Sequence, residues 1–89
     1  MLLILAVALT KCNSNQTPFI YKSYDDVSVI PRVGDTIKEY LFKGARKVVD
    51  VEFEYAESRC IIYLETIELQ CSFEEYIERA KRNGWSERY

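Results

Sequence analysis

The sequence contains no histidine, only three cysteines, three glycines and two prolines, and no large excess of either charge. Without histidine, the chain lacks the commonest general base, the commonest metal ligand and the usual pH switch. Three cysteines are too few for a secreted scaffold held together by many disulfides. Twelve basic residues against fourteen acidic ones give a net charge of −2, so no overall positive field would attract nucleic acid.

Motifs for catalysis and for cofactor binding are also missing. The chain has no Gly-x-Ser-x-Gly elbow, no phosphate-binding loop and no Cys-x-x-Cys pair. Its glycines, Gly34, Gly44 and Gly84, are each explained by a turn or by a helix end. We therefore expect a non-enzymatic protein with no cofactor and no metal site.

The hydrophobic patterning predicts β-strands through most of the chain. Eighty-nine residues fit one small domain, covering 1–89. Residues 48–55 alternate strictly, with Val49, Val51, Phe53 and Tyr55 on one face and Asp50, Glu52 and Glu54 on the other, solvated face. Residues 59–68 carry apolar side chains on both faces, so this strand should be central and form a hairpin with the one before it.

The first residues allow two interpretations. Residues 2–9 are continuously apolar and far too few to span a bilayer as a helix. Residues 2–11 can form a strand that a polar loop joins to a returning strand, Phe19–Tyr24. Alternatively, residues 1–11 are a signal peptide, 12–89 is the mature domain, and Cys12 is the lipid attachment site. In this second interpretation the N-terminus resembles the start of a bacterial lipoprotein.

The C-terminal region predicts one helix followed by a short frayed tail. Ser72 is a suitable N-cap, and Glu75 three residues later completes a Ser-x-x-Glu capping box. Gly84 can adopt the left-handed conformation that ends a helix, and Trp85 then packs back on the last turn. The fold class is therefore mainly β with one C-terminal α-helix, as a small antiparallel sheet or a partly open barrel.

One segment resembles a known group of proteins. Residues 30–35 read Ile-Pro-Arg-Val-Gly-Asp and are followed by a valine-rich strand at residues 48–51. This arrangement is similar to that of short uncharacterised β-barrel proteins of bacteriophage and bacterial genomes. The resemblance implies a fold and no activity.

Three sets of side chains are candidates for sites. Tyrosine is enriched at interfaces, and the chain has seven, so we expect a protein-facing patch around Tyr21, Tyr24 and Tyr40. A basic cluster next to aromatic residues could bind single-stranded nucleic acid; it consists of Lys43, Arg46 and Lys47. A disulfide between Cys60 and Cys71 is a third candidate, because these two cysteines are close in sequence and would close a small loop.

The leading hypothesis from these features is a small cytoplasmic interaction module that binds a protein partner or itself. One alternative is a lipid-anchored bacterial envelope protein, at a membrane only if Cys12 is lipidated. The other is a barrel that binds single-stranded nucleic acid, which the charge balance disfavours.

Overall fold

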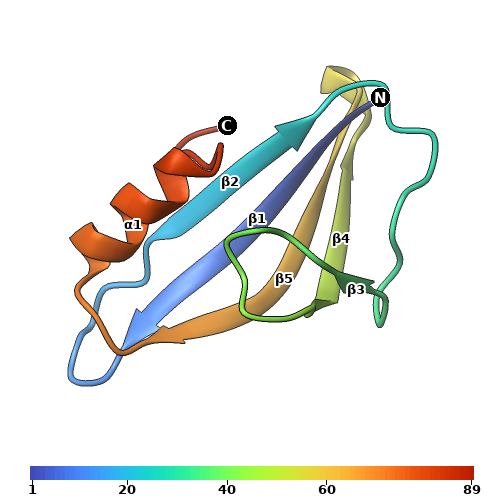
Figure 1. Cartoon of the computed structure of the whole chain (residues 1–89). Coiled ribbons are helices and arrows are strands. Elements are labelled where there is room, and N and C mark those ends of the chain that lie inside the picture. The colour runs from blue at the N-terminus through green and yellow to red at the C-terminus, as the bar shows by residue number, and fades with distance from the viewer.

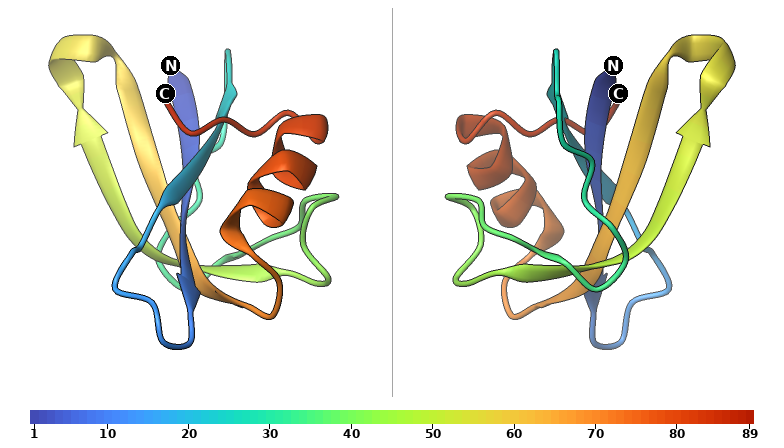
Figure 2. Two further views of the ribbon diagram at one scale, coloured as in Figure 1. Left: turned by 90° about the vertical axis from the view of Figure 1, so that its left-hand side faces the viewer. Right: turned by 90° about the vertical axis from the view of Figure 1, so that its right-hand side faces the viewer.

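A computed structural model describes all of residues 1–89 as a curled sheet that wraps around one helix (Figures 1 and 2). The strands are β1 (Leu2–Lys11), β2 (Phe19–Tyr24), β3 (Thr36–Ile37), β4 (Arg46–Glu54) and β5 (Arg59–Leu69). A short 3₁₀ turn (Tyr55–Glu57) joins β4 to β5, and α1 (Phe73–Arg82) follows. The predicted fold class, mainly β with one C-terminal helix in a partly open barrel, is confirmed.

The sheet is mixed, and the expectation of a wholly antiparallel sheet is wrong on this point. The strand order is β2-β1-β5-β4-β3. Neighbours along the chain pair antiparallel, as β1 does with β2 and β4 with β5. The two hairpins meet through β1 and β5, which run parallel from Leu2 beside Arg59 to Lys11 beside Leu69.

Both central strands are apolar on their two faces because both faces are covered. On the concave face, the side chains of β1 and β5 join the main core with α1 and the loop before β4. On the convex face, Ile4, Ala6 and Ile61 form a second, smaller cluster, which Phe19, Tyr21 and Tyr63 partly cover. Residues 2–11 are thus placed in the middle of the fold.

A β-bulge changes the expected pattern at the start of β4. The partners shift between Val48 and Asp50, so Val48 is buried and Val49 lies exposed. An extra residue in one strand turns the following side chains to the opposite face. Beyond the bulge only Val51 of the predicted buried face packs against the main core, whereas Phe53 and Tyr55 are exposed, so the expectation of one buried face along residues 48–55 is wrong for them.

The helix begins and ends where the sequence predicts. The Ser72 hydroxyl accepts a hydrogen bond of 3.2 Å from the Glu75 amide. At the other end, the amides of Gly84 and Trp85 donate to the carbonyls of Lys81 and Ala80, the Schellman arrangement. Gly84 has a φ of 87°, which a residue with a Cβ rarely adopts. With 10 residues, α1 is too short to cross a membrane, and no other helix is long and apolar enough to do so.

The C-terminal tail is ordered against the sheet, so the expectation of a frayed tail is wrong. Ser86 exchanges backbone hydrogen bonds of 2.7 and 2.8 Å with Tyr21 and so pairs with the outer edge of β2. The Tyr89 ring then packs against Tyr21 at 4.6 Å, and the Arg59 guanidinium lies 5.2 Å from the Tyr89 ring centre.

Candidate functional site: a cationic pocket

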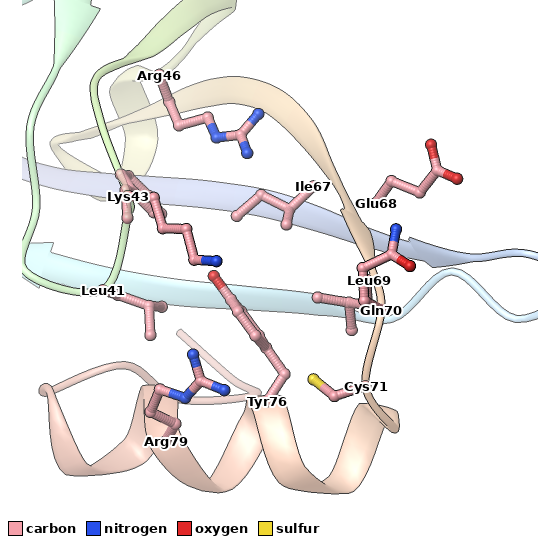
Figure 3. A pocket seen from close by; sticks show the side chains of 11 residues that line it. Leu41, Lys43, Arg46, Ile67, Glu68, Leu69, Gln70, Cys71, Tyr76 and Arg79 are labelled. Atoms are coloured by element: carbon pink, nitrogen blue, oxygen red, sulfur yellow. The ribbon is translucent and has the colours of Figure 1, made fainter.

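An open pocket of about 340 Å³ lies where the end of β5, the helix and the loop before β4 come together (Figure 3). The apolar side chains Leu41, Ile67 and Leu69 belong to the main core and form its floor. The remaining lining residues are mostly polar or charged: Phe42, Lys43, Arg46, Glu68, Gln70, Cys71, Tyr76 and Arg79. We call this site the cationic pocket.

Three cations from separate elements line it. Lys43 comes from the loop, Arg46 begins β4, and Arg79 lies on the last turn of α1. The four ion pairs of the protein are Lys22–Glu39, Arg59–Glu54, Lys81–Glu87 and Arg82–Glu78, so none of the three pocket cations forms an ion pair. The lining also contains one carboxylate, that of Glu68, which leaves the cations in excess. Like charges repel one another, and an anion in the pocket would relieve that repulsion.

The hydroxyl of Tyr76 faces the same space (Figure 3). Tyr76 is buried, 7% exposed, and none of the side-chain hydrogen bonds of the protein involves its hydroxyl. Burial raises the pKa of Tyr76, although the positive charges of Arg46 and Arg79 act in the opposite direction. The hydroxyl therefore keeps its proton at neutral pH and can donate it to an acceptor.

Arg79 is held in place by the same tyrosine. Its guanidinium lies 5.5 Å from the centre of the Tyr76 ring, a cation–π distance. Two guanidinium groups, an ammonium and a phenol hydroxyl are all hydrogen-bond donors, and arginine in particular matches the geometry of phosphate and carboxylate oxygens. The cationic pocket is suited to an oxyanion.

A second cluster fixes the loop that forms one wall of the pocket. Glu39 accepts a hydrogen bond of 2.8 Å from the Tyr24 hydroxyl and pairs with the Lys22 ammonium at 2.9 Å. Burial raises the pKa of Tyr24, and the hydrogen bond to Glu39 adds to this effect. Burial alone would lower the pKa of Lys22, but its contacts with Glu39 outweigh this and raise the pKa. The loop is thereby tied to β2 across the concave face.

The three tyrosines predicted to form a protein-facing patch do not share one face, because Tyr21 lies on the side of the sheet opposite Tyr24; protein binding at these residues stays a prediction. Tyr21 packs on the convex face, next to Phe19 and Tyr89. Tyr24 is three positions further along the same strand, an odd spacing that puts it on the opposite face, where it meets Glu39. Tyr40 projects from the loop and is 95% exposed.

The predicted basic cluster is only partly brought together. Lys43 and Arg46 both line the cationic pocket, whereas Lys47 does not, because successive residues of a strand point to opposite faces. The sequence interpretation missed Arg79 and Tyr76. Their three-residue spacing on one helix was a usable signal, because such residues are neighbours on a helix surface.

The predicted disulfide between Cys60 and Cys71 is wrong. All three cysteines are free thiols. Cys60 stands near the start of β5 and Cys71 just after its end, on the order of 30 Å apart at the usual strand rise, whereas a disulfide needs its Cα atoms within about 7 Å. Burial raises the pKa of the Cys60 thiol. Cys12, the candidate lipid attachment site, is exposed directly after β1.

No three cysteine or carboxylate side chains come together in a way that could hold a metal ion. Comparison with protein-family models, with curated proteins and with solved structures gave no match. Arguments about function therefore rest on the geometry of this chain alone.

Proposed function

We propose that this protein is a non-enzymatic binding module whose cationic pocket takes up a phosphate group of its ligand. The supporting observation is that three cations without an ion-pair partner line one pocket together with the Tyr76 hydroxyl, against a single carboxylate, Glu68. Arginine and lysine side chains, together with neutral hydrogen-bond donors, are the usual partners of phosphate oxygens. Here Lys43 comes from the loop before β4, Arg46 from β4, and Tyr76 and Arg79 from α1.

The size of the pocket limits the ligand. A volume of about 340 Å³ is at the small end of the range for ligand sites, enough for a phosphate with part of a nucleoside and too small for a large cofactor. The phosphate could belong to a free nucleotide or to a single strand of nucleic acid. The second source corresponds to the alternative that the sequence placed at Lys43, Arg46 and Lys47, of which Lys43 and Arg46 line the pocket together with Arg79.

The location of the protein is a separate proposal. We place the protein in the cytoplasm, because three free thiols suit a reducing compartment and because residues 2–11 supply a central strand. A lipid anchor at Cys12 is the alternative. It requires cleavage after Lys11, which would remove β1 from the domain.

The test measures backbone amide shifts of the isotope-labelled protein on addition of inorganic phosphate, a mononucleotide or an oligothymidylate. We expect shifts at residues 41–46 and 67–79. Exchanging Arg46→Gln and Arg79→Gln together should weaken binding by about tenfold or more and lower its salt dependence. Tyr76→Phe keeps the ring and removes only the donor.

Two matched variants serve as controls. Arg82→Gln removes a charge from the same helix outside the pocket, and Lys47→Gln removes the predicted nucleic-acid contact that the fold turns away. Both should bind nearly as the unmodified protein does. Equal losses in all variants, or no shifts from any probe at low ionic strength, would rule out a phosphate site here. A strand that binds more tightly than the mononucleotide would identify nucleic acid as the source.

A further inference from the structure

One edge of the sheet is open along the second half of β4. The first residues of β4 are covered on that side, because Arg46 and Lys47 pair with β3 and Val48 exchanges hydrogen bonds with Gly34 and Asp35. No strand pairs with residues 50–54 on that side. In Figure 2 the upper part of the β4–β5 hairpin stands away from α1 and from the loops. We call residues 50–54 the β4 edge.

Backbone groups on this edge face outward. The Val51 amide donates to the side chain of the preceding Asp50 at 2.9 Å. Because the Val51 amide donates to Asp50, it does not donate to a carbonyl of β5 and points away from that strand. Amides of alternate residues in a strand point to the same side, so the Phe53 amide points outward as well. The β4 edge thus has outward donors and acceptors for an added strand, which would take over the Val51 amide from the Asp50 side chain.

Apolar side chains are exposed beside these groups. Phe53 is 44% and Tyr55 78% exposed, and their rings stack with centres 5.8 Å apart. Val49, the residue before this edge, is also exposed. Large apolar side chains in a row along an unpaired edge are typical of surfaces that another strand covers.

The charges of this edge argue against a second copy of the chain as the occupant. Two copies paired antiparallel through β4 would be related by a two-fold axis perpendicular to the sheet, which keeps both convex faces on the same side. Asp50 and Glu52 would then face carboxylates of the partner, and like charges directly opposite one another are destabilising. Neither carboxylate has a basic partner within the protein.

The same charges favour a basic segment. We propose that the β4 edge binds an extended segment of another protein, in which basic and apolar residues alternate, as an additional strand of the sheet. Basic side chains of that segment lie opposite Asp50 and Glu52 on the convex face. Its apolar side chains lie on the concave side against Phe53. The inference is independent of the cationic pocket, which has the opposite charge.

The experiment uses the whole chain and a synthetic peptide of about ten residues, a usual strand length, in which lysine and valine strictly alternate. Amide shifts should centre on residues 49–55, and hydrogen exchange there should slow. A peptide of equal composition with its lysines and valines in separate blocks tests for simple charge attraction. Two further peptides carry N-methyl groups on the lysines only or on the valines only. Because one alternate set of peptide amides faces β4, one methylated version should lose binding and the other should keep it.

Charge reversal on the protein gives the second test. Asp50→Lys with Glu52→Lys should weaken binding of the alternating peptide by about tenfold or more and create binding of a glutamate–valine peptide. Glu78→Lys with Glu87→Lys makes the same change of net charge at exposed surface pairs and should have little effect. The proposal is overturned if the blocked peptide binds equally well, if both methylated peptides bind, or if both double variants behave alike. Dimerisation of the chain through residues 50–54 would also overturn it.

Discussion

Removing residues 1–11 should abolish folding, and this deletion separates the two interpretations of the N-terminus. In the structure β1 lies between β2 and β5 and hydrogen-bonds to both. A signal peptide is by contrast dispensable for the mature fold. The chain 12–89 therefore tests whether the domain needs its first strand.

The expected loss is as large as the whole stability of the domain. Among the buried side chains of β1, the large ones are Leu3, Ile4, Leu5, Val7 and Leu9. Burying each stabilises the fold by about 1.5–3 kcal/mol, which amounts to roughly 7–15 kcal/mol for the strand. A domain of this length has a total stability of about 4–13 kcal/mol. The hydrogen bonds of two strand pairs are lost as well.

Circular dichroism, amide shift dispersion and urea unfolding would measure the outcome. We expect the chain 12–89 to show narrow dispersion and no cooperative transition. A milder change gives a graded result: Leu5→Ala should cost about 2–5 kcal/mol, whereas Val29→Ala, at a side chain that is 75% exposed, should stay within about 0.5 kcal/mol. A cooperative unfolding transition in the chain 12–89 would refute the central role of β1.

Three further predictions concern stability and reactivity. The raised pKa of Tyr24 means that the folded protein holds this proton more tightly than the unfolded chain. The free energy of unfolding should therefore not depend on this group at neutral pH and should decline above about pH 10. In urea unfolding measured at several pH values, Tyr24→Phe should make this decline smaller, and an unchanged decline would contradict the prediction. In the native protein a thiol reagent should modify Cys12 rapidly and Cys60 only on unfolding, as mass spectrometry of the digested protein would show; equal rates would be inconsistent with the buried position of Cys60. Ser72→Ala should cost about 1 kcal/mol in urea unfolding through loss of the helix cap, and no loss would mean that the cap contributes nothing to the fold.

Much of the fold could be predicted because local sequence features, the helix caps and the apolar patterning, determine it. The capping residues at Ser72 and Gly84 set both ends of α1, since a helix end requires specific partners for its free amides and carbonyls. Apolar residues on both faces marked residues 59–68 as a central strand, and one of the two interpretations of the N-terminus made residues 2–11 a strand. That these two strands are neighbours does not follow from the pattern, because a five-stranded sheet has three interior positions.

The direction of that pairing could not be read from the sequence. Turns determine hairpins locally, but β1 and β5 are joined through the whole chain between them, and either direction would bury the same side chains. The bulge at Val49 has the same origin. It depends on how β4 meets both β5 and the loop at Asp35, which no local pattern encodes.

In the candidate site, too, residues close in sequence could be grouped in advance, whereas residues brought together by tertiary packing could not. Lys43 and Arg46 were identified as a cluster because they are close in sequence. Arg79 joins them only because α1 packs over the end of β5. Conversely, Tyr21 and Tyr24 are close in sequence and were wrongly grouped, although their odd spacing on one strand already indicated opposite faces.

A net charge of −2 conceals a separation of charge along β4. The strand begins with Arg46 at the cationic pocket and carries Asp50 and Glu52 on its open edge. Arg46 and Glu52 are about 20 Å apart at the usual strand rise, which is about two and a half times the screening length of about 8 Å at physiological salt. The two proposed ligands, an oxyanion and a basic segment, should therefore bind independently. Saturation with phosphate should leave the affinity for the lysine–valine peptide unchanged in titration calorimetry, and a changed affinity would show that the pocket and the edge are coupled through β4 itself.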